Sequence, residues 1–260
     1  MPRLRVFSTN YKTTYAEGFS RFLAACPALE VLKMRGESDT YMGFGGGDRV
    51  NRIMNTVLVG ISSSLRTLSL TQIAIDLHSV SGVHLHNLET LILDRCGRGA
   101  PSAVTALAQS NPSLQHLRLV FDGNEDILSF LELPSAQLLS IHITSEMRHT
   151  ALGKMVQEMM HHGVFAKTRS MRFQVMLGVS AANLCGVEMP ELRFLTLPQS
   201  LGDEANMDIF REVLAPALQF LTLKTYASLS MVGNASKIEE LKMVLGHSAG
   251  VPDDVTVCVE

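Results

Sequence analysis

The sequence predicts an α/β solenoid of about ten strand–helix repeats, whose strands form a parallel sheet with one concave face. The first observation is an apolar cadence that recurs along the whole chain at a mean step of about 26 residues. The second is the alternation of apolar and variable residues at the end of each cadence, which is typical of a strand with one buried face. The third is the helical spacing of apolar residues between several cadences.

The cadence consists of a leucine-type residue, two variable residues, a second leucine-type residue, one variable residue and a third leucine-type residue. The ten copies, two of them degenerate, start at Leu4, Leu29, Leu65, Leu88, Leu114, Leu138, Thr168, Leu192, Leu218 and Ile238. We therefore interpret residues 1–260 as a single domain, with repeats near 3–28, 29–64, 65–87, 88–113, 114–137, 138–167, 168–191, 192–217, 218–237 and 238–260.

Several segments between the cadences have the apolar spacing of a helix. The clearest stripe runs from Val50 to Ile61 and follows Asp48, which is a suitable N-cap. Two further helices are predicted, one behind a Thr14–Glu17 capping box and one with Pro101 in its first turn. Similar stripes occur at 152–160 and 207–214.

Polar residues in the strands argue against a closed β/α barrel or a doubly wound sheet. Strands of those folds are buried on both faces and contain near-continuous apolar runs. Here the alternate positions are polar, as in Thr67 and Ser69 or His116 and Arg118. One face of the sheet is therefore open to water, so an enzyme on a β/α framework remains only a remote alternative.

At this level of detail the chain resembles the leucine-rich repeat family. The best-matching segments are 64–70, 87–96 and 112–119, and Cys96 occupies the Asn/Cys position of the family pattern. The period and the helical returns are most similar to the ribonuclease-inhibitor-like group and to the repeat regions of F-box proteins. The resemblance covers residues 3 to about 245 and implies a right-handed horseshoe. Most copies lack Asn or Cys at that position, which predicts uneven curvature.

The composition indicates a packed globular protein, because 46% of the residues are hydrophobic and 18% are charged. The formal net charge of −3 argues against nucleic-acid binding and against a polybasic membrane anchor. No apolar run reaches the roughly 18 residues of a membrane helix, and the N-terminus lacks the apolar stretch of a signal peptide. These features predict a cytoplasmic or nuclear protein.

Residues with catalytic or metal-binding chemistry are sparse. The four cysteines, Cys26, Cys96, Cys185 and Cys258, are too far apart for a patterned zinc or disulfide site, so we expect buried reduced thiols. The glycine cluster at 43–48 lacks the Gly-Lys-Ser/Thr of a phosphate loop and is interpreted as a flexible insertion. His84 and His86 have no accompanying ligand residue at suitable spacing, and we interpret them as exposed loop histidines. No catalytic residue, cofactor or metal is predicted.

The variable strand positions are the candidate functional surface, because they face the concave side if the cadence residues face inward. In the central repeats these positions hold basic residues without an acid, and the two following repeats hold phenylalanines. The predicted partner-binding residues are His116, Arg118, His142, Arg172, Phe194 and Phe220. Aromatic and arginine side chains commonly anchor protein interfaces. Alternatively, these are ordinary solvated residues and the segment 246–260 covers the phenylalanines.

These observations predict a non-enzymatic scaffold for protein–protein interaction. Its protein partner would present acidic residues beside an apolar anchor, and neither nucleic acid nor membrane is expected to bind. An alternative is the substrate-recognition part of an F-box-type ubiquitin ligase receptor that lacks its F-box. Since the first cadence begins at Leu4, no polar N-terminal cap precedes it. We expect self-association or an additional N-terminal segment to cover that edge.

Overall fold

The computed structural model describes ten segments of the chain, namely residues 3–10, 17–36, 47–73, 83–96, 100–121, 139–145, 166–175, 189–198, 216–224 and 256–259. The chain divides into two compact units, Met1–Gln137 and Leu138–Glu260. This boundary falls between the fifth and sixth predicted repeats. Each unit contains parallel strands and is described by itself.

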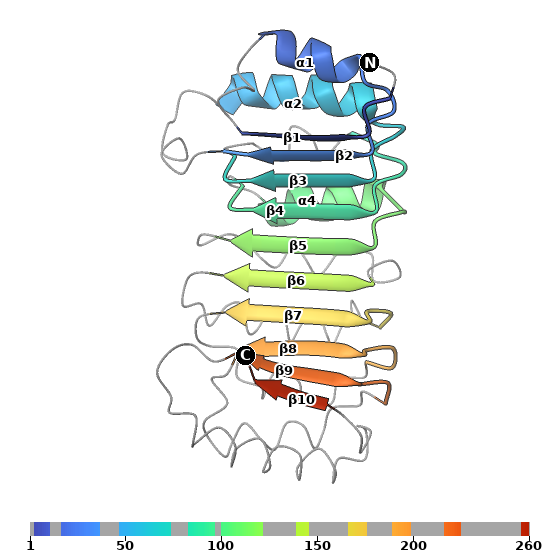
Figure 1. Ribbon diagram of the computed structural model, residues 1–260, viewed down its shortest axis with the longest axis vertical. Helices are drawn as coiled ribbons and strands as arrows, with labels where there is room; N and C mark the ends of the chain where they lie inside the picture. Colours follow the sequence, from blue (N-terminus) through green and yellow to red (C-terminus); the bar gives the residue numbers. More distant parts are fainter. Residues whose placement is uncertain are drawn as a thin grey trace. The chain divides into compact units, whose positions relative to one another are not determined.

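The first unit contains a parallel sheet of five strands in the order in which they occur along the chain (Figure 1). Its strands are β1 (Val6–Asn10), β2 (Val31–Arg35), β3 (Thr67–Thr71), β4 (Thr90–Asp94) and β5 (His116–Phe121). Every strand begins two residues after the first position of a cadence. The apolar cadence therefore predicted the position of each strand in this unit.

The pairing register places equivalent cadence residues side by side across the sheet. Leu68 is paired with Leu32 on one side and with Leu91 on the other, and Leu91 is paired with Leu117. All four side chains are almost completely buried. A one-residue slip of a single strand would turn its whole apolar set towards solvent. Such a slip is unfavourable, because full burial of one leucine contributes about 1.5–3 kcal/mol.

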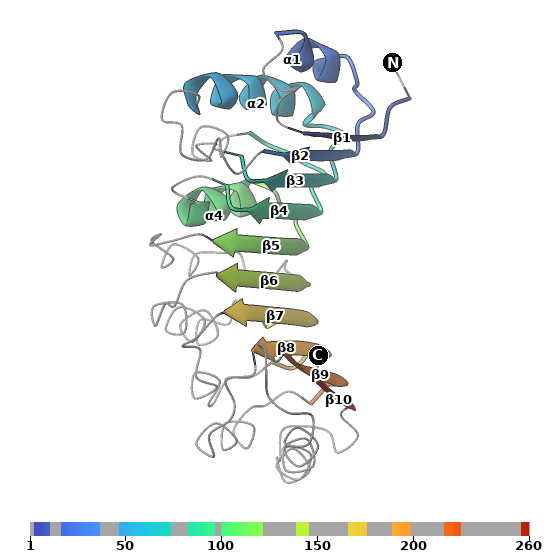
Figure 2. The same cartoon turned by 60° about the vertical axis from the view of Figure 1, so that its left-hand side comes forward.

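Three helices lie along one side of this sheet (Figures 1 and 2). They are α1 (Glu17–Ala24), α2 (Gly47–Ile61) and α4 (Ala100–Ser110). The predicted stripe of α2 is confirmed, since Met54, Val57, Leu58 and Ile61 are fully buried. The helix begins at Gly47, so Asp48 lies within its first turn and is not the N-cap. Pro101 lies in the first turn of α4, as predicted.

Aromatic side chains hold α1 against the first strand. The ring of Phe7 on β1 lies 5.9 Å from the ring of Phe19 and 5.6 Å from that of Phe22, measured between centroids. Both pairs are tilted, which is a favourable aromatic geometry. Phe19 is buried, whereas Phe22 is partly exposed. The aromatic contact therefore lies at the boundary between the core and solvent in the first repeat.

At the start of the strands, one backbone carbonyl in each repeat accepts two hydrogen bonds from the next repeat. The carbonyl of Arg5 accepts from the N–H groups of Glu30 and Val31 at 2.8 and 2.9 Å. The carbonyl of Glu30 accepts from Arg66 and Thr67 with the same distances. The carbonyls of Arg66 and Glu89 continue this pattern through β4 and β5. A carbonyl has two lone pairs, so this arrangement satisfies two donors at the point where each chain segment enters the sheet.

A second backbone ladder follows the strand ends. Gly36 donates to the carbonyl of Thr71 at 2.7 Å, and Gln72 donates to that of Asp94 at 2.7 Å. Gln72 and Arg95 occupy equivalent positions, and each has a φ of 54°. This left-handed conformation is uncommon for residues other than glycine, and the recurrence of the turn in neighbouring repeats stabilises it.

Cys96 fills the interior of the turn that follows β4. Its Sγ donates to the carbonyl of Leu70 in the neighbouring repeat at 3.1 Å, and it lies 3.4 Å from the carbonyl of Asp94. Burial raises the pKa of this thiol from its ordinary value of 9.0 to about 12. Cys26 is also a free buried thiol. The prediction of buried thiols is therefore confirmed for these two cysteines, while the side chains of Cys185 and Cys258 lie outside the described residues.

The second unit also contains a parallel sheet of five strands in chain order (Figure 1). Its strands are β6 (Ser140–Ser145), β7 (Ser170–Val175), β8 (Phe194–Pro198), β9 (Phe220–Lys224) and β10 (Thr256–Val259). In this unit the first four strands also begin two residues after a cadence starts. Met171 is paired with Ile141 and with Leu195, so the apolar cadence again runs across the sheet in register.

The last strand differs from the sequence prediction. The strand paired with β9 is Thr256–Val259, and Val257 lies beside Leu221. The cadence at 238–243 was expected at this place, but those residues lie outside the described part of the chain. Val257 and Val259 provide the same period-two pattern as a cadence, which allows this later segment to take the position beside β9.

Four other sequence expectations fall on residues that the structure does not describe, namely Thr14 of the capping box, the helical stripes at 152–160 and 207–214, and the glycine cluster up to Gly46. Among the described residues, no helix is both long enough and apolar enough to cross a membrane.

Replacement of Gly36 by alanine should destabilise the first unit. A Cβ atom at this position would collide with the backbone carbonyl of Gln72, which cannot rotate away. We expect Gly36→Ala to lower the free energy of unfolding by about 2 kcal/mol or more, measured by urea denaturation. Gly18 is the matched control, because a Cβ there meets no atom within 4 Å and α1 favours alanine. Gly18→Ala should leave stability unchanged or raise it by up to about 1 kcal/mol. Equal losses in both variants would contradict the crowded turn.

The buried thiol of Cys96 should make stability depend on pH in alkaline solution. The pKa of Cys96 is higher in the folded chain than in the unfolded chain, so its contribution is fully present below about pH 9 and is lost as pH rises towards about 12. Between pH 9 and pH 10 we expect wild type to lose roughly 1 kcal/mol more stability than Cys96→Ala. Urea denaturation of both proteins at several pH values measures this difference. Parallel curves would show that the thiol is not buried as described.

Candidate binding face

The strands of each unit present one face on which cadence residues are absent. In the first unit, this open face consists of three rows of side chains that run across the sheet. The row nearest the strand starts contains Val6, Val31, Thr67, Thr90 and His116. The middle row contains Ser8, Lys33, Ser69, Ile92 and Arg118, and the last row contains Asn10, Arg35, Thr71, Asp94 and Val120. Nearly all of these residues are half-buried or exposed, whereas the alternate residues form the core.

Two predicted binding residues, His116 and Arg118, lie on β5 and are both exposed. They are paired with Thr90 and Ile92 of β4. Both side chains therefore belong to the open face of the first unit. The alternating burial of β5 arises from its sequence, in which Leu117 and Leu119 point into the core.

The other four predicted residues belong to the second unit and form two neighbouring pairs. His142 on β6 is in register with Arg172 on β7, so these two basic residues lie in the same row. Phe194 on β8 is in register with Phe220 on β9, in the row nearest the strand starts. The prediction that the two phenylalanines are neighbours is confirmed by this register. The side chain of Phe220 lies outside the described residues.

Arg172 and Phe194 each have a feature that favours a binding site. The Nε of Arg172 is buried, and it has no hydrogen-bond partner among the described residues. The side chain of Phe194 is 45% exposed, although it is large and apolar. Ser170 is in register with Phe194 and lies two residues before Arg172 on β7. Arg172 and Phe194 therefore occupy adjacent strands and adjacent rows of the open face. Parallel strands are about 4.8 Å apart, so one ligand can contact both side chains.

Two further cations, which were not predicted as binding residues, lie on the open face. Lys33 and Arg35 lie on β2, in the middle and last rows, and both are exposed. With Arg118 on β5 they provide three cations across strands that span about 14 Å. Lys33 stands at a variable position within its cadence, whereas Arg35 follows the last residue of that cadence, Met34. Asp94 is the acidic residue of these rows, and it already forms an ion pair with Arg95 at 3.0 Å.

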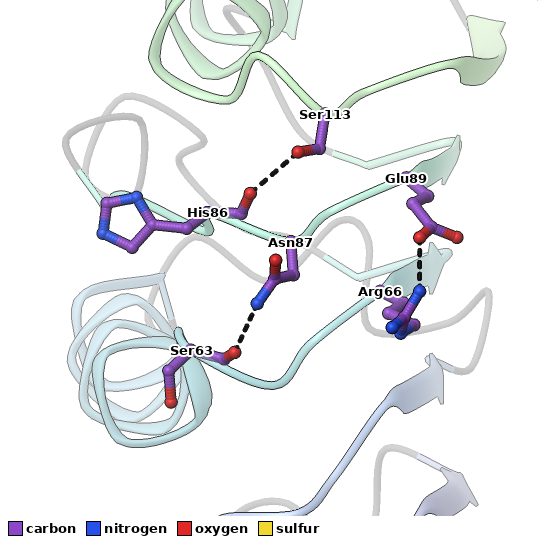
Figure 3. A network of polar contacts seen from close by, with 6 residues as sticks. All are labelled: Ser63, Arg66, His86, Asn87, Glu89 and Ser113. Atoms are coloured by element: carbon purple, nitrogen blue, oxygen red, sulfur yellow. Dashed lines mark hydrogen bonds and ion pairs between the residues drawn. The ribbon is translucent and has the colours of Figure 1, made fainter.

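Three basic residues beside the strand starts differ from those of the open face because they have acidic partners. Arg66 and Glu89 form an ion pair at 2.5 Å (Figure 3). Arg5 and Glu30 lie 3.6 Å apart at the corresponding positions of the first two repeats. In the second unit, Arg169 and Glu191 lie 3.3 Å apart. In the first unit, Arg5, Glu30, Arg66 and Glu89 alternate in sign between repeats, so no single charge marks this row in the sequence.

Four cations of the open faces form no ion pair with another described residue, namely Lys33, Arg35, Arg118 and Arg172. A chain with a formal net charge of −3 thus presents locally basic faces. Such a distribution attracts an anionic partner more strongly than the net charge suggests. Among the described residues, no group of three or more histidines, cysteines or carboxylates has the arrangement of a metal site.

Comparison with known protein families finds no family model that matches this chain. Comparison with curated proteins likewise finds no significant match.

Arg66 and Arg118 provide a direct comparison of a paired and an unpaired surface cation. We expect Arg66→Ala to cost up to about 1 kcal/mol of stability, because it removes an exposed ion pair with Glu89. Arg118→Ala should change the free energy of unfolding by less than about 0.5 kcal/mol, since it removes no described pair. Urea denaturation in low and high salt measures both effects. A salt-sensitive loss in Arg118→Ala would show that this arginine already has a partner within the chain.

Proposed function

We propose that this protein is a non-enzymatic protein-recognition scaffold of the leucine-rich repeat type. The parallel sheets, the cadence in the core and the helices behind the first sheet support a solenoid of about ten βα repeats. In this proposal the open faces of the two sheets form its concave surface. Right-handed horseshoe curvature follows from the same family resemblance.

The single observation that carries the proposal is the combination of Arg172 and Phe194. A buried donor without an acceptor costs about 1–3 kcal/mol relative to a satisfied one. Because Nε is buried, a turn of the Arg172 side chain towards a partner carboxylate would replace this unsatisfied state with a charge-assisted hydrogen bond and recover the free energy. An apolar group beside that carboxylate would cover the exposed ring of Phe194. Arginine and aromatic residues together are typical centres of protein interfaces.

The cations of the first unit extend this proposal to a partner with several acidic residues. Lys33, Arg35 and Arg118 have no described acidic partner, so pairing them with carboxylates breaks no existing contact. Each rim contact of this kind contributes little free energy by itself but accelerates association and selects against basic partners. The partner of the proposal is therefore an acidic protein segment with one apolar anchor.

Photo-crosslinking from the open face tests this function. The photoreactive residue p-benzoylphenylalanine replaces Phe194 in one variant and Val59 in the control. Val59 lies on α2 and is 60% exposed, so it presents a comparable apolar side chain far from the open face. We expect a specific crosslinked protein from position 194 and none from position 59. Mapping the crosslinked peptide should locate acidic residues next to an apolar one.

The purified partner then allows affinity to be measured by isothermal titration calorimetry. We expect Arg172→Glu to weaken binding by a factor of about 30 or more, because it places a like charge against the partner carboxylate. Arg118→Glu should also weaken binding, with a smaller effect that disappears in high salt. Arg66→Glu is the charge-matched control and should bind as wild type does. Full affinity in Arg172→Glu, or equal crosslinking from both positions, would refute the proposal.

A further inference from the structure

His84 and His86 form a pair of neighbouring imidazoles on the first unit, outside the candidate binding face. Their ring centroids are 6.0 Å apart and their ring planes differ by only 9°. Both residues are exposed and precede β4, in a segment without regular secondary structure. The prediction that they are exposed loop histidines is confirmed, and their mutual geometry is additional information.

Buried and exposed residues alternate along the loop, which places both histidine rings on its solvent side. Leu85 lies between the two histidines and is completely buried, and Val83 is also buried. Alternate residues of an extended segment point in opposite directions. Burial of Val83 and Leu85 therefore holds His84 and His86 towards solvent, one on each side of the anchoring leucine.

Hydrogen bonds hold this loop at three consecutive residues, through the backbone of the first two and the side chain of the third. The N–H of Leu85 donates to Oδ1 of Asn111 at 2.5 Å, and Asn111 is itself fixed because its Nδ2 donates to the carbonyl of Leu107. The carbonyl of His86 accepts from Oγ of Ser113 at 2.9 Å. Nδ2 of Asn87 donates to the carbonyl of Ser63 at 2.6 Å. The loop is thus connected to the preceding and the following repeats.

The ring of His86 remains outside this network. Figure 3 shows its backbone carbonyl directed towards Ser113, while its imidazole points away from Asn87 and Ser63. Within the described part of the chain, the rings of His84 and His86 contact one another, and neither forms a hydrogen bond or an ion pair with another residue. Their nitrogen atoms are therefore available to a ligand.

From this geometry we infer that His84 and His86 chelate a divalent transition-metal ion, with Cu²⁺ as the preferred ion. A metal–nitrogen bond to imidazole is about 2.0–2.1 Å, which places two rings on one ion with centroids about 4.5–6.4 Å apart for angles of 90° or more. The separation of 6.0 Å lies in this range. The exposed rings need only rotate about their Cβ–Cγ bonds to direct one nitrogen each towards the ion.

The donor set determines the class of ion. Two neutral imidazoles are borderline ligands that suit Cu²⁺, Ni²⁺ and Zn²⁺, and among these Cu²⁺ has the highest intrinsic affinity. Ions that prefer oxygen ligands, such as Ca²⁺ and Mg²⁺, find no carboxylate in this pair. Two protein ligands leave coordination positions for water or for a donor from another molecule. The site is independent of the proposed partner-binding face, and its test does not rest on that proposal.

Calorimetric titration of the metal-free full chain with CuCl₂ tests the inference. We expect His84→Asn and His86→Asn each to weaken the tightest Cu²⁺ site by at least about tenfold, because each removes one of two ligands. His116→Asn is the matched control, since His116 is an exposed histidine on β5 whose register neighbour is Thr90. Its Cu²⁺ affinity should equal that of wild type. Thermal unfolding of each variant without metal establishes that the fold is retained.

Electron paramagnetic resonance of the Cu²⁺ complex gives an independent readout. Wild type with one equivalent of Cu²⁺ should display nitrogen hyperfine splitting from two equatorial imidazoles, and each single variant should display fewer. Unchanged titration curves in both His84→Asn and His86→Asn would overturn the inference. A two-nitrogen signal that persists in the double variant would also overturn it, because the ion would then be bound by other histidines.

Discussion

The fold depends on one recurring constraint, which is the parallel, in-register contact between a strand and the equivalent strand of the next repeat. Two interactions enforce it together. Buried cadence residues such as Leu68 lie directly beside their equivalents, so a slip of one residue would turn the core of that strand towards water. The carbonyl at each strand start accepts two N–H groups from the following repeat, as Glu30 does from Arg66 and Thr67. Apolar burial selects the register, and these hydrogen bonds satisfy the backbone at that register.

This constraint separates structural residues from residues that are free to bind. Because the cadence and the helices occupy one side of the first sheet, the other side contains side chains that contribute little to its stability. Basic residues beside the strand starts, such as Arg66, are neutralised by acids of the next repeat. Basic residues on the open face, such as Arg118, have no such described partner. The same separation applies to the loop before β4, where Leu85 anchors the chain and His84 and His86 remain accessible.

Much of the fold could be predicted because its signals are local. The period of the cadence located β1 to β9, and the apolar stripe located α2. The prediction was wrong at the partner of β9, since Thr256–Val259 pairs there in place of the 238–243 segment. A four-residue strand without the full cadence carries too little pattern to be recognised. The candidate site was predicted in part: the register confirms Phe194 beside Phe220 and His142 beside Arg172, whereas Arg35 was missed because it follows the cadence.

The sequence by itself determined the α/β class, the strand positions and the division of each strand into inward and outward residues. These properties depend on periodicity, which short-range sterics and apolar burial translate directly into structure. Tertiary structure alone decided which outward residues are paired and which are not. Arg66 and Glu89 are 23 positions apart, and the segment between them determines whether their side chains meet. Likewise, only packing reveals that Nε of Arg172 is buried without an acceptor and that Asn111 fixes the loop of the paired histidines. Such contacts depend on chain segments that are distant in sequence, and no local pattern encodes them.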